Sequence, residues 1–351
     1  MKFIQIADTH LGARPDTNKP WGEKRERELW ETFELVIKEA DKRDVDMVLI
    51  AGDLFHGQPL LRELKEVNFM LSTLRRAKVI IIAGNHDYIR ENSYYNTFEW
   101  CENVYFLGDE EMDRIVLDDL QTDIYGFSYH SQEITQNRYD AIEIEDKDKI
   151  NILLAHGGDE KHVPINKKRL KYAGFDYIAF GHIHKPEIDS SIPMGYCGSL
   201  EPMNVNETGN HGFIYGEVDE RGCHVELIPF AKRKYIHKSL HDDGTRTNAS
   251  LRQEIQEILT EEGIENIYKF NIKGFRNSEI NYDIDYLKCL GNIVQVDDQT
   301  VPYFDFTRLE QENRGNLLGR FIHNMEERTD SVGQKALFYG TKALLDAMKK
   351  S

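Results

Sequence analysis

The sequence of 351 residues predicts a layered α/β fold with parallel strand pairing in its first part. Two observations support this prediction. Short, continuously apolar runs of strand length recur along the chain, and amphipathic helical patterns separate the first of them. The resulting order of strand, helix, strand, helix, strand is typical of parallel strands joined by crossover helices.

Five apolar runs fit strands that are buried on both faces, because they lack the alternation of a half-exposed strand. They occupy residues 3–7, 47–52, 79–84, 151–155 and 177–181. The stretches 26–43 and 60–76 each place apolar residues on one stripe, as an amphipathic helix does. These helices lie between the first three predicted strands.

The pattern changes in the second half of the chain. Segments within 192–230 are short and broken by Gly and Pro, which predicts antiparallel strands. Periodicity is then lost, so we expect a domain boundary near 241–247. Beyond it, 249–262 predicts a helix, and 268–274 alternates apolar and polar residues like a half-exposed strand.

Two amphipathic helices are predicted near the end of the sequence. One carries Leu317, Leu318, Phe321, Ile322 and Met325, and the other carries Leu337, Leu344, Leu345 and Met348. We therefore expect a main domain over 1–241, a smaller α+β domain over 248–310, and a helical segment over 311–351.

Composition excludes several classes of protein. Hydrophobic residues make up 40% of the chain and charged residues 30%, which is typical of a folded protein and not of a disordered one. No apolar run approaches the roughly 20 residues that span a bilayer, so we expect no membrane attachment. Four widely spaced cysteines without a CxxC pair argue against a disulfide framework and favour a cytoplasmic location.

The chain is acidic, with a formal net charge of −17. Proteins that bind nucleic acid on their own usually present a positive surface. A polyanionic substrate would therefore need a local basic patch, metal ions or a partner. One basic cluster, which fits either a nucleic-acid contact or a solvated helix face, contains Lys161, Lys167, Lys168, Arg169 and Lys171.

Each of the five apolar runs is followed at once by a polar side chain that can bind a metal. The ligand crevice of an α/β sheet lies beyond the carboxyl ends of its strands. A polar cap explains one such residue, but five strand ends with this property indicate a site. The candidate ligands are Asp8, His10, Asp53, Asn85, His156, His182 and His184.

The spacing of these candidates suggests how they share one cavity. Residues two apart on an extended chain point the same way, so Asp8 and His10 are expected to face the cavity together. The same holds for His182 and His184. Four imidazoles, two carboxylates and one amide exceed the three protein ligands of an ordinary catalytic zinc site, so two metal ions are predicted. Asp53 is the best candidate for a bridging carboxylate.

The ligand types also indicate the metal and the reaction. Nitrogen and oxygen ligands without thiolate favour Mn²⁺, with Fe²⁺ or Zn²⁺ as alternatives, over Ca²⁺ or Mg²⁺. A pair of such ions can activate water and stabilise an in-line displacement on phosphorus. Phosphoester hydrolysis is therefore the predicted reaction.

Five motifs cover the first two-thirds of the chain in order. They are ADTH (7–10), GDLFH (52–56), GNHD (84–87), AHGG (155–158) and GHIH (181–184). Together they resemble the calcineurin-like metallophosphoesterase superfamily. The resemblance implies a layered β-sandwich flanked by helices. The GDxVDRG and GNHE motifs of the serine/threonine phosphatases are missing from the sequence.

The motif GDLFH further resembles the double-strand-break repair nucleases of the SbcD type. This resemblance implies one metal ion on Asp8, His10, Asp53 and His184. It implies a second ion on Asp53, Asn85, His156 and His182. It also implies three catalytic residues: His86 would act on the scissile phosphate or leaving oxygen, Asp87 would orient His86, and His56 would contact the phosphate.

The same resemblance implies DNA as substrate, a small capping domain, a homodimer, and an SMC-like coiled-coil ATPase of the SbcC type as partner. The helix 60–76 and the aromatic stretch 88–100 flank the third strand, where the family dimerises, although a core role fits them equally well. The terminal helices fit either ATPase docking or packing on their own domain.

Seven further histidines lie outside the motifs and are expected to be structural or on the surface: His130, His162, His211, His224, His237, His241 and His323. Three functions stay open at this point. The first is a Mn²⁺-dependent DNA exonuclease and endonuclease in double-strand-break repair. The second is a phosphodiesterase or phosphatase for a small nucleotide, and the third is a non-catalytic assembly subunit.

Overall fold

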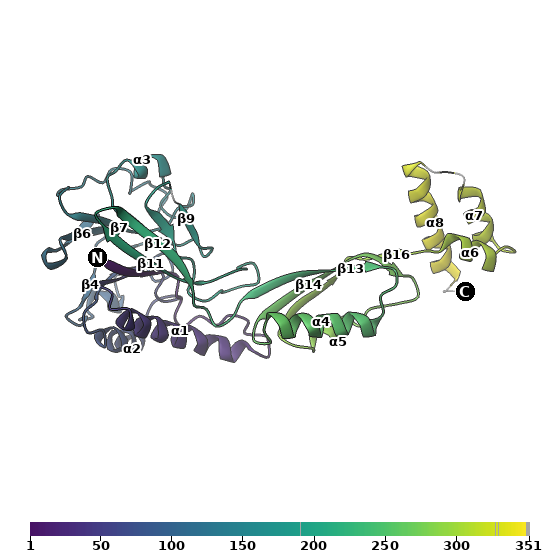
Figure 1. Cartoon of the computed structure of the whole chain (residues 1–351), viewed down its shortest axis with the longest axis horizontal. Helices are drawn as coiled ribbons and strands as arrows, with labels where there is room; N and C mark the ends of the chain where they lie inside the picture. The colour runs from purple at the N-terminus through teal and green to yellow at the C-terminus, as the bar shows by residue number, and fades with distance from the viewer. Residues whose placement is uncertain (190, 327, 329, 349–351) are drawn as a thin grey trace. The chain divides into compact units, whose positions relative to one another are not determined.

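The computed structural model describes residues 1–189, 191–326, 328 and 330–348. The chain divides into two compact units (Figure 1). The first unit contains Met1–Ile236 together with Glu265–Tyr268, and the second contains His237–Ile264 and the chain from Lys269 onward. The division falls inside strand β13, Tyr235–Asp243, which also runs into the predicted boundary region 241–247.

The first unit contains two six-stranded sheets, as the layered prediction requires. The first sheet has the order β12-β11-β1-β2-β3-β4. The strands β1 to β4 run parallel, and β11 pairs antiparallel with both β1 and β12. Their bounds are β1 Lys2–Ile6, β2 Met47–Ala51, β3 Lys78–Ile82, β4 Val104–Phe106, β11 Gly212–Asp219 and β12 Gly222–Pro229.

The second sheet has the order β5-β6-β7-β8-β10-β9. Its bounds are β5 Asp113–Leu117, β6 Thr122–Gly126, β7 Ile150–His156, β8 Tyr177–Gly181, β9 Glu187–Asp189 and β10 Met194–Tyr196. The antiparallel prediction for 192–230 holds for β11 and β12, whereas β10 pairs antiparallel with β9 and parallel with β8. Its three residues lie between these two strands, and no local pattern in so short a segment distinguishes that position from a hairpin strand.

One apolar core lies between the two sheets. A further apolar core lies against the outer face of each sheet. Phe3 and Leu49 point into the core between the sheets, which also contains Leu154 from β7. Ile4 and Ile50 point the opposite way, toward helices α1 (Gly22–Lys42) and α2 (Leu61–Ser72). Strands with apolar neighbours on both faces explain why their sequences are continuously hydrophobic.

The outer face of the second sheet packs against loops and the short helix α3 (Lys167–Lys171). Tyr129 and Tyr139 are fully buried there, and both hydroxyl groups donate to the carbonyl oxygen of His156, at 3.0 and 2.9 Å. The first unit also contains two short 3₁₀ helices, Tyr94–Asn96 and Asp118–Leu120.

The second unit begins with an α+β element. Helix α4 (Asn248–Glu262) buries Leu251, Ile255 and Leu259 on one face. Strand β14 alternates buried and more exposed residues, as predicted for 268–274. The remaining elements are α5 Ile284–Lys288, β14 Ile267–Asn277, β15 Ile293–Asp298 and β16 Val301–Tyr303.

Three helices follow: α6 (Phe306–Glu312), α7 (Leu317–Glu326) and α8 (Ser331–Met348). The two predicted terminal helices are α7 and α8, and α6 was not expected. Leu318, Ile322 and Leu337 are buried among them, so the predicted apolar stripes pack largely on one another. No helix in the described part of the chain combines the length and apolar character needed to cross a bilayer.

Candidate metal centre

The predicted ligands meet at the carboxyl ends of strands from both sheets. Asp8 follows β1, Asp53 follows β2 and Asn85 follows β3, all in the first sheet. His156 ends β7 of the second sheet, and His182 and His184 follow β8. The structure brings all seven predicted ligands together.

Several of these side chains point into the centre because their backbone adopts positive φ angles, which we did not predict from the sequence. Asp8, His10 and Asp53 have φ angles of 50°, 45° and 51°, and His182 has 89°. The assumption that Asp8 and His10 lie on an extended chain is therefore wrong. Strands β1, β2 and β8 end just before their ligands, and left-handed residues there redirect the chain, at a strain cost of about 1–3 kcal/mol each that surrounding contacts must offset.

Contacts between strand ends hold these turns. The amide of Asp8 donates to the carbonyl of Gly52 at 3.1 Å, and the amide of His10 donates to the carbonyl of Asp53 at 3.1 Å. A Cβ atom on Gly84 would collide with the Asp53 carboxylate. Glycine before the ligand Asn85 therefore allows the close approach that the centre requires.

The first group of donors contains Asp8, His10 and His184, whose ligand atoms all lie within 4.8 Å of one another. The Nε2 atoms of His10 and His184 are 3.0 Å apart. Asp53 lies beside this group, with Oδ2 3.8 Å from His10 Nε2.

The second group surrounds the side-chain oxygen of Asn85. Oδ1 of Asn85 is 2.9 Å from His156 Nε2 and 3.0 Å from His182 Nδ1. Oδ2 of Asp53 is 3.5 Å from the same His156 nitrogen. One carboxylate oxygen of Asp53 thus faces both groups, which is the position that a bridging ligand needs.

The donors fit a pair of divalent cations. Asp8 and Asp53 are 0% and 1% exposed, and their neighbours are imidazoles and backbone N–H groups. Among the residues that the structure describes, no Lys or Arg side chain pairs with either carboxylate. Buried carboxylates whose partners are imidazoles need positive charge nearby, either from protonation of the rings or from bound metal ions. Bound cations would supply the missing positive charge, and the nitrogen and oxygen donor set suits a dinuclear site.

The pKa values in the centre diverge because burial and charge act in opposite directions. Burial raises the pKa of Asp8 to about 6. Burial would also raise the pKa of Asp53, but the adjacent His156 and His10 outweigh it and hold that pKa below its usual range. Burial lowers the pKa of His182 to about 4, assisted by His156. Asp53 is therefore the carboxylate that stays ionised over the widest pH range.

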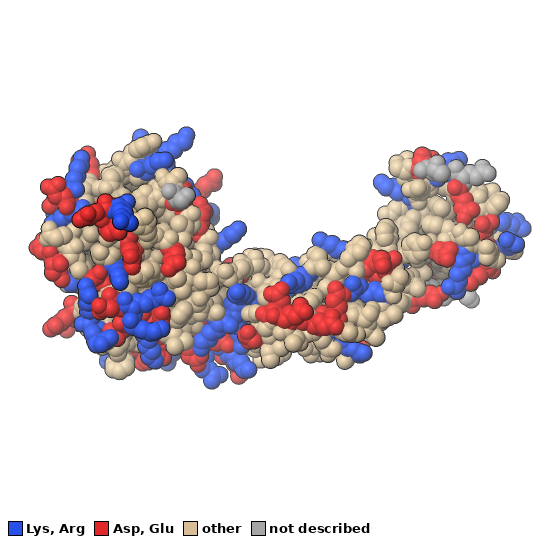
Figure 2. Space-filling view, in the orientation of Figure 1, with Lys and Arg blue, Asp and Glu red and all other residues tan. Residues whose placement is uncertain are grey.

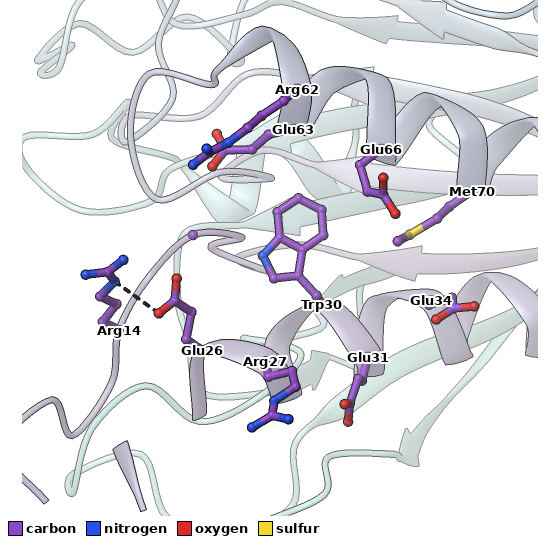
Figure 3. A pocket seen from close by; sticks show the side chains of 11 residues that line it. Arg14, Glu26, Arg27, Trp30, Glu31, Glu34, Arg62, Glu63, Glu66 and Met70 are labelled. Atoms are coloured by element: carbon purple, nitrogen blue, oxygen red, sulfur yellow. Dashed lines mark ion pairs between the residues drawn. The ribbon is translucent and has the colours of Figure 1, made fainter. Parts of the chain in front are cut away.

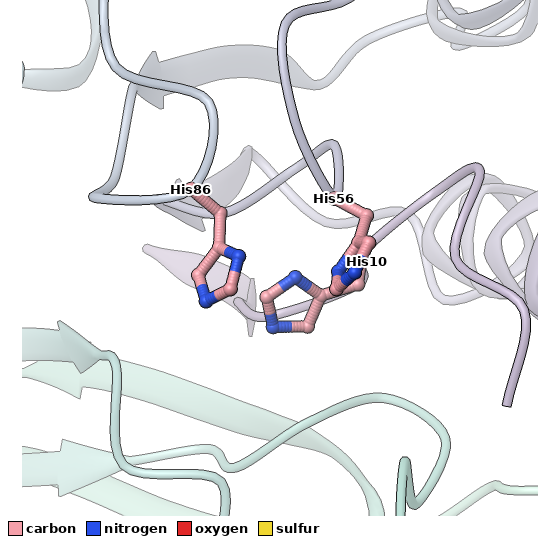
Figure 4. A group of neighbouring side chains, drawn as sticks. All are labelled: His10, His56 and His86. Atoms are coloured by element: carbon pink, nitrogen blue, oxygen red, sulfur yellow. The ribbon is translucent and has the colours of Figure 1, made fainter. Parts of the chain in front are cut away.

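Three histidines form a second cluster at the edge of the centre (Figure 4). The rings of His56 and His86 stack with centroids 5.3 Å apart, and the rings of His10 and His86 are T-shaped with centroids 4.7 Å apart. His10 is buried, whereas His56 and His86 are exposed. The exposed pair is available to a substrate that reaches the buried ligands.

The Asp87 carboxylate, which was predicted to orient His86, contacts the backbone of two loops and a tyrosine hydroxyl. It accepts from the amides of Gly84 and Phe55, at 2.8 and 3.2 Å, and from the Tyr95 hydroxyl at 2.9 Å. Asp87 thus fastens the loop that carries His86 to the loop that carries His56. Burial, together with Asp53, raises the pKa of Asp87 to about 7.

Two carboxylates near the centre were missed by the sequence argument. Asp159 Oδ2 lies 2.7 Å from His182 Nε2, and Glu207 Oε1 lies 2.9 Å from His184 Nδ1. Asp159 also contacts His162 Nδ1 at 2.9 Å, so His162 belongs to the surroundings of the centre. Neither carboxylate lies in one of the five motifs. Asp159 directly follows AHGG, which is the one signal that could have pointed to it.

A pocket in the first unit is separate from this centre. It has a volume of about 550 Å³ and lies between α1 and α2 (Figure 3). Trp30 and Met70 line it together with five Glu and three Arg side chains, and Arg14 pairs with Glu26 at 3.1 Å. It contains none of the predicted ligands.

Comparison with known proteins agrees with this arrangement. The family model described as calcineurin-like phosphoesterase matches residues 1–186, which is more than half of the chain. The chain belongs to this family. As a calcineurin-like phosphoesterase, it is a metal-dependent phosphoester hydrolase, and the matched residues include every predicted ligand.

Similar curated proteins include repair proteins. The chain is 28% identical over 233 residues to an uncharacterized metallophosphoesterase, YhaO, of Bacillus subtilis, covering 61% of this chain and 56% of that protein. It is 28% identical over 275 residues to the DNA double-strand break repair protein Mre11 of Aeropyrum pernix, covering 71% and 66%. The Methanocaldococcus jannaschii Mre11 is 29% identical over 261 residues, covering 69% and 70%. The chain thus spans between 56% and 70% of the length of these relatives.

Proposed function

We propose that this calcineurin-like phosphoesterase is a DNA nuclease that hydrolyses phosphodiester bonds with two Mn²⁺ ions. The observation that carries the proposal is the convergence of seven buried or half-buried ligands beneath an exposed pair, His56 and His86. Relatives named as DNA double-strand break repair proteins favour DNA over other phosphodiesters.

Each part of the centre has a distinct role in this proposal. A pair of divalent ions, when bound, activates a water molecule and stabilises charge on the phosphate. His86 stands next to the centre and delivers a proton to the leaving oxygen, as a general acid does. His56 contacts the phosphate. Asp87 and Tyr95 keep both histidines in place through the loop backbone.

Binding of DNA requires local positive charge, because the whole chain carries a net charge of −17. Figure 2 shows Lys and Arg side chains around α3, and intermixed charges over the rest of the visible face. Lys168, Arg169 and Lys171 are exposed there. Lys161 and Lys167 pair with Glu133 and Glu187 at 3.1 and 2.7 Å. The cluster therefore offers three exposed cations for backbone contacts.

The proposal includes partners. We infer that the nuclease works as a homodimer in the cytoplasm with an SMC-like coiled-coil ATPase. Helix α2 exposes Leu61 and Phe69, at 39% and 68%, beside its buried face, which suits a dimer contact. The terminal helices expose Leu317, Val332 and Tyr339, which suits docking to the ATPase.

The decisive experiment compares two substrates with Mn²⁺ present. End-labelled duplex DNA should be cut, and His86→Gln should abolish most cutting while both ions stay bound. Hydrolysis of a small nucleotide diester without cutting of DNA would instead support the second candidate, which the acidic surface favours. If the Mn²⁺-loaded wild-type protein neither cuts DNA nor hydrolyses the small diester, the proposal is contradicted.

A further inference from the structure

Each imidazole of the metal centre has two ring nitrogens, and only one faces the other ligands. In His182 the inner nitrogen is Nδ1, 3.0 Å from Asn85 Oδ1, and the outer nitrogen is Nε2, 2.7 Å from Asp159 Oδ2. In His184 the order is reversed. Its inner nitrogen is Nε2, 3.0 Å from His10 Nε2, and its outer nitrogen is Nδ1, 2.9 Å from Glu207 Oε1.

A carboxylate on the outer nitrogen has a specific chemical effect. A neutral imidazole carries one N–H, and the carboxylate holds that proton on the outer side. The inner nitrogen then presents its lone pair to the centre in a fixed direction. Such an outer partner typically changes metal affinity by about 10–100-fold.

The other two imidazoles lack a carboxylate in this position. The outer nitrogen of His156, Nδ1, lies 2.8 Å from the carbonyl of Ala51, which is part of the backbone. Nδ1 of His10 is buried and has no hydrogen-bond partner in the described part of the chain. Asp159 and Glu207 are therefore the two side-chain carboxylates that contact the outer ring nitrogens of the histidine ligands.

We propose that Asp159 and Glu207 are positioning residues that each control the affinity of a different metal ion. Asp159 acts through His182 on the ion held with Asn85 and His156. Glu207 acts through His184 on the ion held with Asp8 and His10. This inference rests on the two-metal centre of the proposed function.

The two carboxylates differ in how firmly they are held. The Glu207 side chain is 10% exposed and also accepts from the Met203 amide at 2.7 Å and the Ser199 hydroxyl at 3.1 Å. The Asp159 side chain is 45% exposed, although the amides of Lys161 and His162 donate to it at 2.8 and 2.9 Å. Solvent screens the exposed pair more strongly. Glu207 should therefore have the larger effect.

The test is a stepwise Mn²⁺ titration of the full chain, followed by calorimetry and by the electron paramagnetic resonance signals of single and coupled ions. Glu207→Ala should weaken one of the two binding steps by about 10–100-fold, and Asp159→Ala should weaken the other by about 10-fold. Glu207→Gln keeps an acceptor oxygen and should show a smaller loss than Glu207→Ala. Asp159→Asn keeps an acceptor oxygen and should restore part of the loss. Glu160→Gln and Glu220→Gln, both exposed, are the matched controls and should bind like the wild type.

A double variant separates positioning from general damage. If Asp159 acts through His182, Asp159→Ala should add little to the loss caused by His182→Ala alone. Thermal unfolding of metal-free Glu207→Gln should match the wild type. Equal weakening of both steps by either variant, or wild-type affinity in both variants, would overturn the inference. So would a third Mn²⁺ per chain that Asp159→Ala removes, because Asp159, His162 and His182 would then form a site of their own.

The outcome also separates this inference from the proposed function. Altered Mn²⁺ binding with no cutting of DNA by the wild type would support the positioning roles and contradict the nuclease. Cutting of DNA by the wild type, with unaltered Mn²⁺ binding in both variants, would support the nuclease and contradict the positioning roles.

Discussion

The two units of the chain bury their strands differently. In the first unit, all five residues of β2 are buried, because one face packs on helices and the other on the second sheet. In the second unit, β14 alternates buried and more exposed residues. A strand enclosed on both sides delivers the residue after it into a site sheltered from water, whereas a half-exposed strand does not.

The chemistry follows this difference. Among the described residues, all four groups of His, Asp and Glu that lie close enough to hold an ion belong to the first unit. Large apolar side chains are exposed in both units, among them Phe69 and Tyr172 in the first and Phe275, Tyr303 and Tyr339 in the second. The candidate metal centre therefore lies in the first unit, and of the contacts proposed above only the docking to an ATPase is assigned to the second.

The largest effect should come from the ligand that both halves of the centre share. Asp53→Ala should lower the Mn²⁺ content from about two ions per chain to nearly none, and should reduce diester hydrolysis by more than about 10⁴-fold. Elemental analysis of the refilled protein measures the first quantity. His184→Ala is the comparison, since it should empty mainly one site. Two ions retained in Asp53→Ala would remove the bridging role.

A smaller loss of activity should follow when the proposed general acid is removed and the metal ligands are kept. His86→Gln should retain both ions and the fold while lowering turnover on DNA by roughly 10²–10⁴-fold, the usual scale for a positioned acid or base. Metal content and turnover must be measured on the same sample. Wild-type turnover in a fully loaded variant would rule out His86 as the acid.

Substitutions in the cores of the two units should show whether the stability of one unit affects hydrolysis by the other. Ile322→Ala removes a buried side chain from α7 and should destabilise α6 to α8 by about 2–5 kcal/mol. Hydrolysis of a small diester should stay at the wild-type level. Phe33→Ala, in the core beneath the first sheet, should lower both stability and hydrolysis. Hydrogen exchange locates the loss, and reduced diester hydrolysis in Ile322→Ala would show that the units depend on each other.

The smallest effect concerns DNA affinity. The acidic chain alone should bind duplex DNA with a shallow salt dependence, since each phosphate neutralised contributes a slope of only about −0.9 in log K against log salt. An ATPase partner should steepen the slope, and removal of α8 should abolish that gain while small-diester hydrolysis continues. A steep slope for the isolated chain, or partner binding after removal of α8, would contradict this division of roles.

Much of the first unit was predictable from local patterns. The continuous apolar runs predicted β1, β2, β3, β7 and β8, because burial on both faces leaves no polar position in such a strand. The helical stripes predicted α1 and α2, although α1 begins at Gly22 and α2 ends at Ser72, earlier than expected at both points. Apolar periodicity is strongest inside an element and weak at its ends, where capping contacts decide.

The sequence by itself identified the seven candidate ligands, because parallel strands bring the residues after them to one edge of each sheet. How those residues reach the centre was decided by tertiary structure. Asp8, His10 and Asp53 adopt left-handed backbone angles that contacts between neighbouring strand ends maintain. Asp and His enter this region more often than most other residues, but it is uncommon even for them, so their local sequence does not predict it. The partners of the ligands were likewise beyond local prediction. Asp87 bonds backbone amides and Tyr95, and Glu207 reaches His184 from a loop distant in sequence. Their positions depend on how separate segments pack, which sequence spacing does not encode.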